Sequence, residues 1–124
     1  MKQKRSVGLD RKRGRRVIFK KAVHSMIDED GAKLKNISKS GCLINARQWL
    51  KVDETCHEIS INHQNLSPVT AVGKVVRAKM VQDEHGAMVY EIGIRFSEDD
   101  PHYQVYRNWF KALVEAVKPP EKNK

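Results

Sequence analysis

The stretch VTAVGKVVRAKMVQDEHGAMVYEIGIRF, residues 69–96, holds two runs rich in β-branched and aromatic residues on either side of Asp83-Glu84-His85-Gly86. Two such runs joined by a short polar segment that contains glycine predict an antiparallel hairpin. The first run carries an apolar side that we expect to comprise Val72, Val75, Val76, Ala78 and Met80. This hairpin indicates that the chain is a β protein, and the neighbouring segments agree.

Four shorter strand candidates precede the hairpin. An apolar pattern from Val17 to Ile27 ends at Asp28-Glu29-Asp30-Gly31, which is a strong turn signal. The others contain Ala32, Leu34 and Ile37, then Cys42-Leu43-Ile44, and then Glu58-Ile59-Ser60-Ile61-Asn62. Six short strands with turn residues between them favour a mainly β fold, a small closed or nearly closed antiparallel barrel.

The pattern changes to a helical one after the last strand. Asp100 is expected to be the N-cap and Pro101 the first helical residue. An apolar face then recurs every four residues at Val105, Trp109, Leu113 and Val117, widened by Phe110 and Val114. We expect this C-terminal helix to pack on the barrel and to end before Pro119-Pro120.

The excess of positive over negative charge is confined to one end of the chain. The 124 residues include 24 Lys and Arg and 15 Asp and Glu, a formal net charge of +9. Residues 1–21 hold ten of the basic residues and one acid, Asp10, whereas the rest of the chain is balanced. This distribution predicts a flexible basic arm over residues 1–10, a domain over residues 11–118 and a disordered tail over residues 119–124.

Several function classes find no support in the sequence. No apolar run is long enough for a membrane span, and no hydrophobic segment of a signal peptide follows the basic arm. With two cysteines that form no CxxC pair, we expect a cytoplasmic protein with reduced thiols. Nucleophile-elbow, Walker and GxGxxG motifs are absent, and the histidines have no recognised zinc spacing. The sequence therefore predicts neither an enzyme nor a resident metal or cofactor.

Two segments carry groups suited to an anionic ligand. The first is Arg11-Lys12-Arg13-Gly14-Arg15-Arg16, whose guanidinium groups match phosphates and the O6/N7 edge of guanine. The second is Asn36-Ile37-Ser38-Lys39-Ser40-Gly41, which places an amide, a hydroxyl and a glycine between two strand candidates. Taken separately, the first is also consistent with a solvated basic tail and the second with an ordinary turn.

Taken together, the motifs resemble those of a known family. An RxxxR element (Arg11, Arg15) is followed by [D/N]xSxxG (Asn36, Ser38, Gly41), and Gly93-Ile94-Arg95-Phe96 closes the last strand before the helix. In this order they resemble the PilZ domain family, from about Asp10 to Val117. The resemblance implies a six-stranded, split-barrel type antiparallel barrel with a C-terminal helix. It also implies a bacterial receptor for the second messenger cyclic di-GMP.

The resemblance assigns roles to individual residues. Arg11 and Arg15 would grip the phosphates and guanine faces, with Arg16 as a helper; Asn36 and Ser38 would bind a guanine, and Gly41 would shape the loop. The chain departs from the family pattern at Asn36, where Asp is usual and its two acceptors suit guanine N1–H and N2–H₂ better. Lys12 and Arg16 share the spacing of Arg11 and Arg15, so the register of the RxxxR element stays open.

Three interpretations of the function stay open at this point. The first is a non-catalytic cyclic di-GMP receptor whose arm orders over the ligand and relays the signal to an unidentified protein partner. The second is a small nucleic-acid-binding barrel, which the absence of a basic stripe outside the arm and the small number of aromatic residues disfavour. The third is a nucleotide-blind adaptor of PilZ type that uses its helix for protein contacts.

Overall fold

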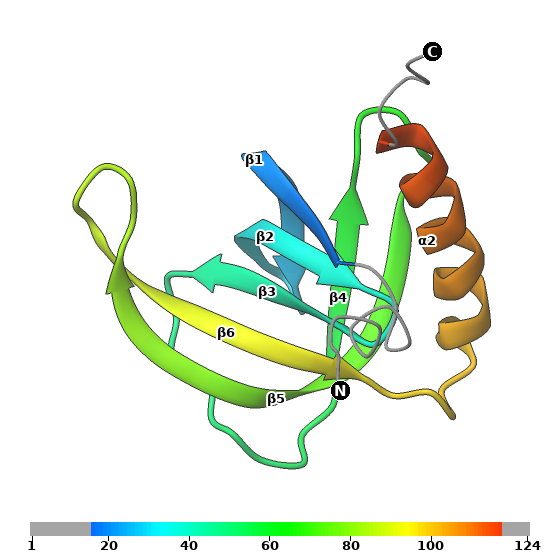
Figure 1. The fold of residues 1–124 in the computed structure, drawn as a ribbon. Helices are drawn as coiled ribbons and strands as arrows, with labels where there is room; N and C mark the ends of the chain where they lie inside the picture. The colour runs from blue at the N-terminus through cyan, green and yellow to red at the C-terminus, as the bar shows by residue number, and fades with distance from the viewer. Residues whose placement is uncertain (1–15, 118–124) are drawn as a thin grey trace, which may run out of the picture.

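The computed structural model describes residues 16–117. The predicted arm and tail, and with them Arg11 and Arg15, lie outside the described residues, so the expected domain limits stay predictions. Figure 1 shows six strands followed by one helix: β1 (Arg16–Ile27), β2 (Asp30–Ser38), β3 (Gly41–Ala46), β4 (His57–Asn62), β5 (Val69–Gln82), β6 (Met88–Phe96) and α2 (His102–Val117). The predicted mainly β fold with a C-terminal helix is confirmed.

The strands close into a barrel. Their order around it is β1-β2-β3-β6-β5-β4, and every neighbouring pair is antiparallel. β1 makes the closure, because its second half pairs with both β2 and β4 while its first half pairs with β2 alone. The first residue of β1, Arg16, thereby lies opposite Ser38 at the end of β2.

Alternating side chains fill the interior. Most apolar residues of the strands point inward, as small barrels require when side chains rather than a channel occupy the centre. The buried set contributed by β2 to β6 is Ala32, Leu34, Ile37, Cys42, Ile44, Ala46, Ile59, Ile61, Val69, Ala71, Val75, Ile92, Ile94 and Phe96. The outer face of the sheet is left to the residues between them.

The expected apolar side of β5 was partly wrong. Val75 is buried and Ala78 packs against the core, but Val76 and Met80 are largely exposed. Val75 pairs with Ile94 and Arg77 with Gly93, so Val76 is an extra residue on β5 and forms a bulge. Val76 and Arg77 both face outward at the bulge, so Val75 and Ala78, three residues apart, lie on the inner side and a strict period of two fails along this strand.

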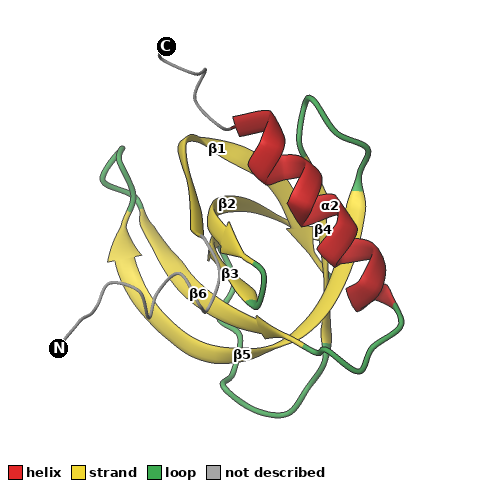
Figure 2. Ribbon diagram, turned by 45° about the vertical axis from the view of Figure 1, so that its right-hand side comes forward, coloured by secondary structure: helices red, strands yellow, loops and turns green. Residues whose placement is uncertain are grey.

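The helix covers one end of the barrel (Figure 2). Its buried residues are Tyr106, Trp109, Phe110 and Leu113. The prediction was correct for the last three of these, but it missed Tyr106 and was wrong for Val105 and Val117, which are exposed. The expected N-cap is confirmed, since the Asp100 carboxylate accepts a hydrogen bond from the His102 N–H at 2.8 Å. The helix begins at His102, one residue after the expected Pro101.

The Tyr106 ring explains the shift of the buried face. It lies edge-on to Phe96, with ring centroids 4.6 Å apart, and its side chain is fully buried. At the other side of the helix the Trp109 indole N–H donates to the Ser67 carbonyl at 2.9 Å, in the loop before β5. These contacts fix the rotation of α2 about its axis and turn Val105 outward.

Candidate functional site

The turn between β2 and β3 carries the second sequence motif. The Ser38 hydroxyl donates to the Gly41 carbonyl at 3.3 Å and accepts from the Ser40 N–H, also at 3.3 Å. Ser38 is buried, and its own carbonyl accepts a hydrogen bond from the Tyr106 hydroxyl. In this structure the Ser38 side chain therefore stabilises the turn through hydrogen bonds to its backbone.

Gly41 is required by the close approach of two strands. A Cβ atom at this position would lie 2.2 Å from the carbonyl oxygen of Ile94 on β6. Such contact with a backbone atom cannot be relieved by a side-chain rotation. The glycine of the motif thus lets β3 lie against β6 directly beside the turn.

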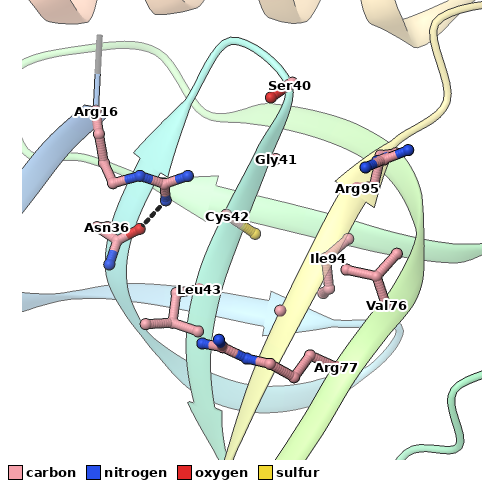
Figure 3. Close-up of a pocket in the computed structure, with 11 residues that line it drawn as sticks. Arg16, Asn36, Ser40, Gly41, Cys42, Leu43, Val76, Arg77, Ile94 and Arg95 are labelled. Atoms are coloured by element: carbon pink, nitrogen blue, oxygen red, sulfur yellow. Dashed lines mark hydrogen bonds between the residues drawn. The ribbon is translucent and has the colours of Figure 1, made fainter. Parts of the chain in front are cut away.

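Arg16, at the start of β1, and Asn36, near the end of β2, are in contact (Figure 3). The Arg16 guanidinium donates from Nη1 to the Asn36 Oδ1 atom. Arg16 is exposed and Asn36 half-buried, so both remain accessible to a ligand. The pairing of β1 with β2 is what brings the end of the arginine-rich segment to the second motif.

These residues border a groove of about 640 Å³ on the outer face of the barrel. It crosses β2, β3, β6 and β5, and its lining is shown in Figure 3. The residues are Arg16, Asn36, Ser40, Gly41, Cys42, Leu43, Val76, Arg77, Gly93, Ile94 and Arg95. This described lining contains three arginines and no acid, which gives the groove a positive potential and donors for an anion.

The neutral groups near the groove do not alter that charge. Burial raises the pKa of the Cys42 thiol from 9.0 to about 12. Burial likewise raises the pKa of Tyr106 well above its usual range. Both therefore stay protonated and uncharged at neutral pH, so the charged residues that line the groove are the three arginines.

Three of the predicted site residues gather at this groove: Arg16, Asn36 and Gly41. Ser38 lies in the adjoining turn, with its hydroxyl engaged there. Sequence reasoning missed Arg77, whose position depends on the bulge in β5. It also left Arg95 without a role, although the residue belongs to the quoted Gly93–Phe96 motif.

The described residues hold no metal-binding cluster, no helix suited to crossing a membrane and no disulfide. Across residues 16–117, no group of three or more His, Cys, Asp or Glu side chains is placed to hold a metal ion. Within the same range, none of the helices has the length and apolar content needed to cross a membrane. Cys42 and Cys56 are both free thiols, the first buried and the second exposed.

The protein is thus a small antiparallel barrel with an arginine-lined groove on its outer face. The sequence model of the PilZ domain matches residues 10–116, and the chain belongs to the PilZ domain family. Among curated proteins, a sequence search finds no significant match.

Two solved structures share the fold at low sequence identity. One is the PilZ domain, with c-di-GMP, of YcgR from Escherichia coli: 14% identity, a TM-score of 0.57, and 84% of this chain and 92% of that one covered. The other is the uncharacterized Legionella protein Lpg0364: 15% identity, a TM-score of 0.56, and coverage of 85% and 99%.

Proposed function

We propose that this protein is a non-catalytic receptor for cyclic di-GMP in the bacterial cytoplasm. The observation that carries the proposal is the groove at which Arg16, the end of the arginine-rich segment, contacts Asn36 of the second motif. Membership of the PilZ family and the likeness to the YcgR domain with c-di-GMP support the choice of ligand. No resident cofactor or metal takes part in the proposal.

The chemistry of the groove suits a compact dianion with purine bases. Guanidinium groups donate paired hydrogen bonds to phosphates and to the O6/N7 edge of guanine. Apolar side chains such as Leu43 and Val76 offer surface on which a base can lie. Asn36 would give up its bond to Arg16 and use its amide for the guanine edge, which releases the Arg16 guanidinium for a phosphate.

Relay to a partner is the second part of the proposal. Residues 1–15 lead directly into Arg16, which itself lines the groove, so a ligand bound there lies beside the point at which the arginine-rich segment enters β1. Arg11 and Arg15 would close over the ligand, and the ordered arm would form a new surface for a downstream protein. The free energy for this ordering comes from charge-assisted hydrogen bonds that only the bound state makes.

Calorimetric titration of the full chain with cyclic di-GMP tests the proposal. We expect Arg15→Ala to remove a charge-assisted contact worth about 2 kcal/mol, which weakens binding by a factor of about 30. Arg5→Ala makes the same change of charge in the arm outside the motif and serves as the matched control. We expect its affinity to stay within about a factor of two of the wild type.

The competing interpretations predict different results. A nucleic-acid module would bind a short oligonucleotide with an affinity that falls steeply with salt, and would show little preference for the dinucleotide. A nucleotide-blind adaptor would give no heat with cyclic di-GMP at concentrations on the order of tens of micromolar. Either result would contradict the proposed function.

A further inference from the structure

One line of outward-facing residues crosses four strands of the barrel. Leu43 on β3 pairs with Asn36 on β2 and with Gly93 on β6, and Gly93 pairs with Arg77 on β5. All four line the groove described above. Asn36 and Arg77 therefore stand at opposite ends of one row, with an apolar side chain and a glycine between them.

Bulges put both ends of this row on the outer face. On β5 the extra residue is Val76, and on β2 it is Lys35, which lies between the pairs Leu34–Ile44 and Asn36–Leu43. Without Val76 as an extra residue, Arg77 would share the inward face of Val75. The bulge thus turns a guanidinium outward that regular alternation would point into the core.

Gly93 leaves the path across β6 open. A Cβ atom there would already lie 3.6 Å from the Arg77 Cβ atom, so any longer side chain would occupy the space above the strand. In Figure 3 the Arg77 side chain runs from β5 across β6 in the direction of Leu43. The guanidinium is thereby directed into the groove, toward the side on which Arg16 contacts Asn36.

Arg77 forms only a weak ion pair, with Glu91 on β6. Glu91 Oε1 lies 3.6 Å from Arg77 Nη2 and 3.7 Å from Lys79 Nζ, distances beyond those of hydrogen bonds. The Arg77 side chain is 60% exposed, and ion pairs of this kind contribute little to stability. Its five N–H donors therefore remain available to a ligand.

We infer that Arg77 is a ligand-binding residue that holds a phosphate of the cyclic dinucleotide at the end of the groove opposite Arg16. The inference rests on the proposed function and extends it, because a cyclic dinucleotide carries two phosphates and the groove offers a guanidinium at each end. Glu91 opposes this contact, since its carboxylate competes with the phosphate for Arg77. The two residues consequently have opposite effects on affinity.

The test is titration of cyclic di-GMP into the full chain and four variants. Arg77→Ala removes a bidentate charged contact and is expected to weaken binding at least about 10-fold, with Arg77→Lys in between. Glu91→Gln removes the competing charge and is expected to tighten binding about 2-fold to 5-fold. Arg47→Ala is the matched control, because Arg47 is exposed, lines a separate cavity beside Ile27 and Gly31, and does not line this groove.

Each outcome decides between the two proposals. If the wild type binds and Arg77→Ala binds within twofold of it, the role of Arg77 is wrong while the proposed function stands. Equal losses in Arg77→Ala and Arg47→Ala would show a general effect of charge and also overturn the role. If the wild type does not bind, the proposed function is wrong and this inference falls with it. Should Arg77→Ala fail to fold in a thermal melt, Glu91→Gln decides, and unchanged or weaker binding contradicts the inference.

Discussion

At the scale of single residues, the second motif combines ligand groups with groups that hold the backbone. Asn36 faces the groove and contacts Arg16. In contrast, the Ser38 hydroxyl donates a hydrogen bond to the Gly41 carbonyl in the turn, and Gly41 permits the close approach of β3 to β6. A motif read only as a list of ligand contacts hides this division. Substitution of the residues that hold the backbone should therefore change the free energy of unfolding rather than the affinity for a ligand.

Gly41→Ala tests that division. The new Cβ atom would lie 2.2 Å from the Ile94 carbonyl oxygen, so the strands must separate, at a cost of about 2 kcal/mol or more in the free energy of unfolding. Gly31→Ala is the control, since no atom lies within 4 Å of its Cβ position and its φ is not positive. Denaturant unfolding should leave Gly31→Ala within about 1 kcal/mol of the wild type. Equal stability of the two variants would contradict the steric argument.

At the scale of elements, helix α2 is joined to the motif turn. The Tyr106 hydroxyl donates to the Ser38 carbonyl, and the Tyr103 hydroxyl donates to the Lys39 carbonyl at 3.2 Å. Tyr106 is fully buried, while the hydrogen bond of Tyr103 is exposed. The helix therefore both covers the barrel and fixes the turn beside the groove.

The two tyrosines give a matched pair of variants. In Tyr106→Phe the Ser38 carbonyl loses a buried donor that water cannot replace, and we expect a loss of about 1–2 kcal/mol in the free energy of unfolding. In Tyr103→Phe water can take over the bond, and we expect a loss below about 0.5 kcal/mol. Urea titrations of both variants measure the difference. A larger loss for Tyr103→Phe would show that the exposed contact, not the buried one, holds the turn.

At the scale of the whole molecule, closure of the barrel isolates its interior from solvent. Cys42 lies on β3 with 4% of its surface exposed, and the same burial raises the pKa of its thiol to about 12. Cys56, in contrast, is exposed in the loop before β4. Because β3 pairs with β2 on one side and with β6 on the other, Cys42 does not lie on an edge strand that could separate alone.

Alkylation at about pH 7.5 measures this isolation, since only thiolates react. We expect one reactive thiol, Cys56, in the folded protein and two after denaturation. Rapid reaction of Cys42 in the folded protein would contradict a closed barrel.

The raised pKa also sets a pH dependence. The unfolded chain releases the Cys42 proton near pH 9.0, before the folded chain does. The stability that comes from keeping the Cys42 thiol protonated is therefore fully present below pH 9.0. It is lost as the pH rises from 9.0 toward 12, where the folded protein also releases the proton.

Local sequence patterns correctly predicted the number of strands, their order along the chain, the N-cap of the helix and the family motifs. Alternation, turn residues and capping act between near neighbours in the chain, so the local pattern contains them. Prediction from local patterns failed where contacts between distant segments determine the structure. The cases are the bulge at Val76, the rotation of α2 that buries Tyr106 and the exposure of Val105.

Which polar side chains share the groove depends on the folded barrel. Arg16, Asn36 and Arg77 come from three strands, and barrel closure together with two bulges brings them to one face. The register between strands depends on how the whole core packs, a property that no segment of the sequence holds alone. For this reason the motifs indicated a ligand, but the position of Arg77 at the other end of the groove could be seen only in the folded barrel.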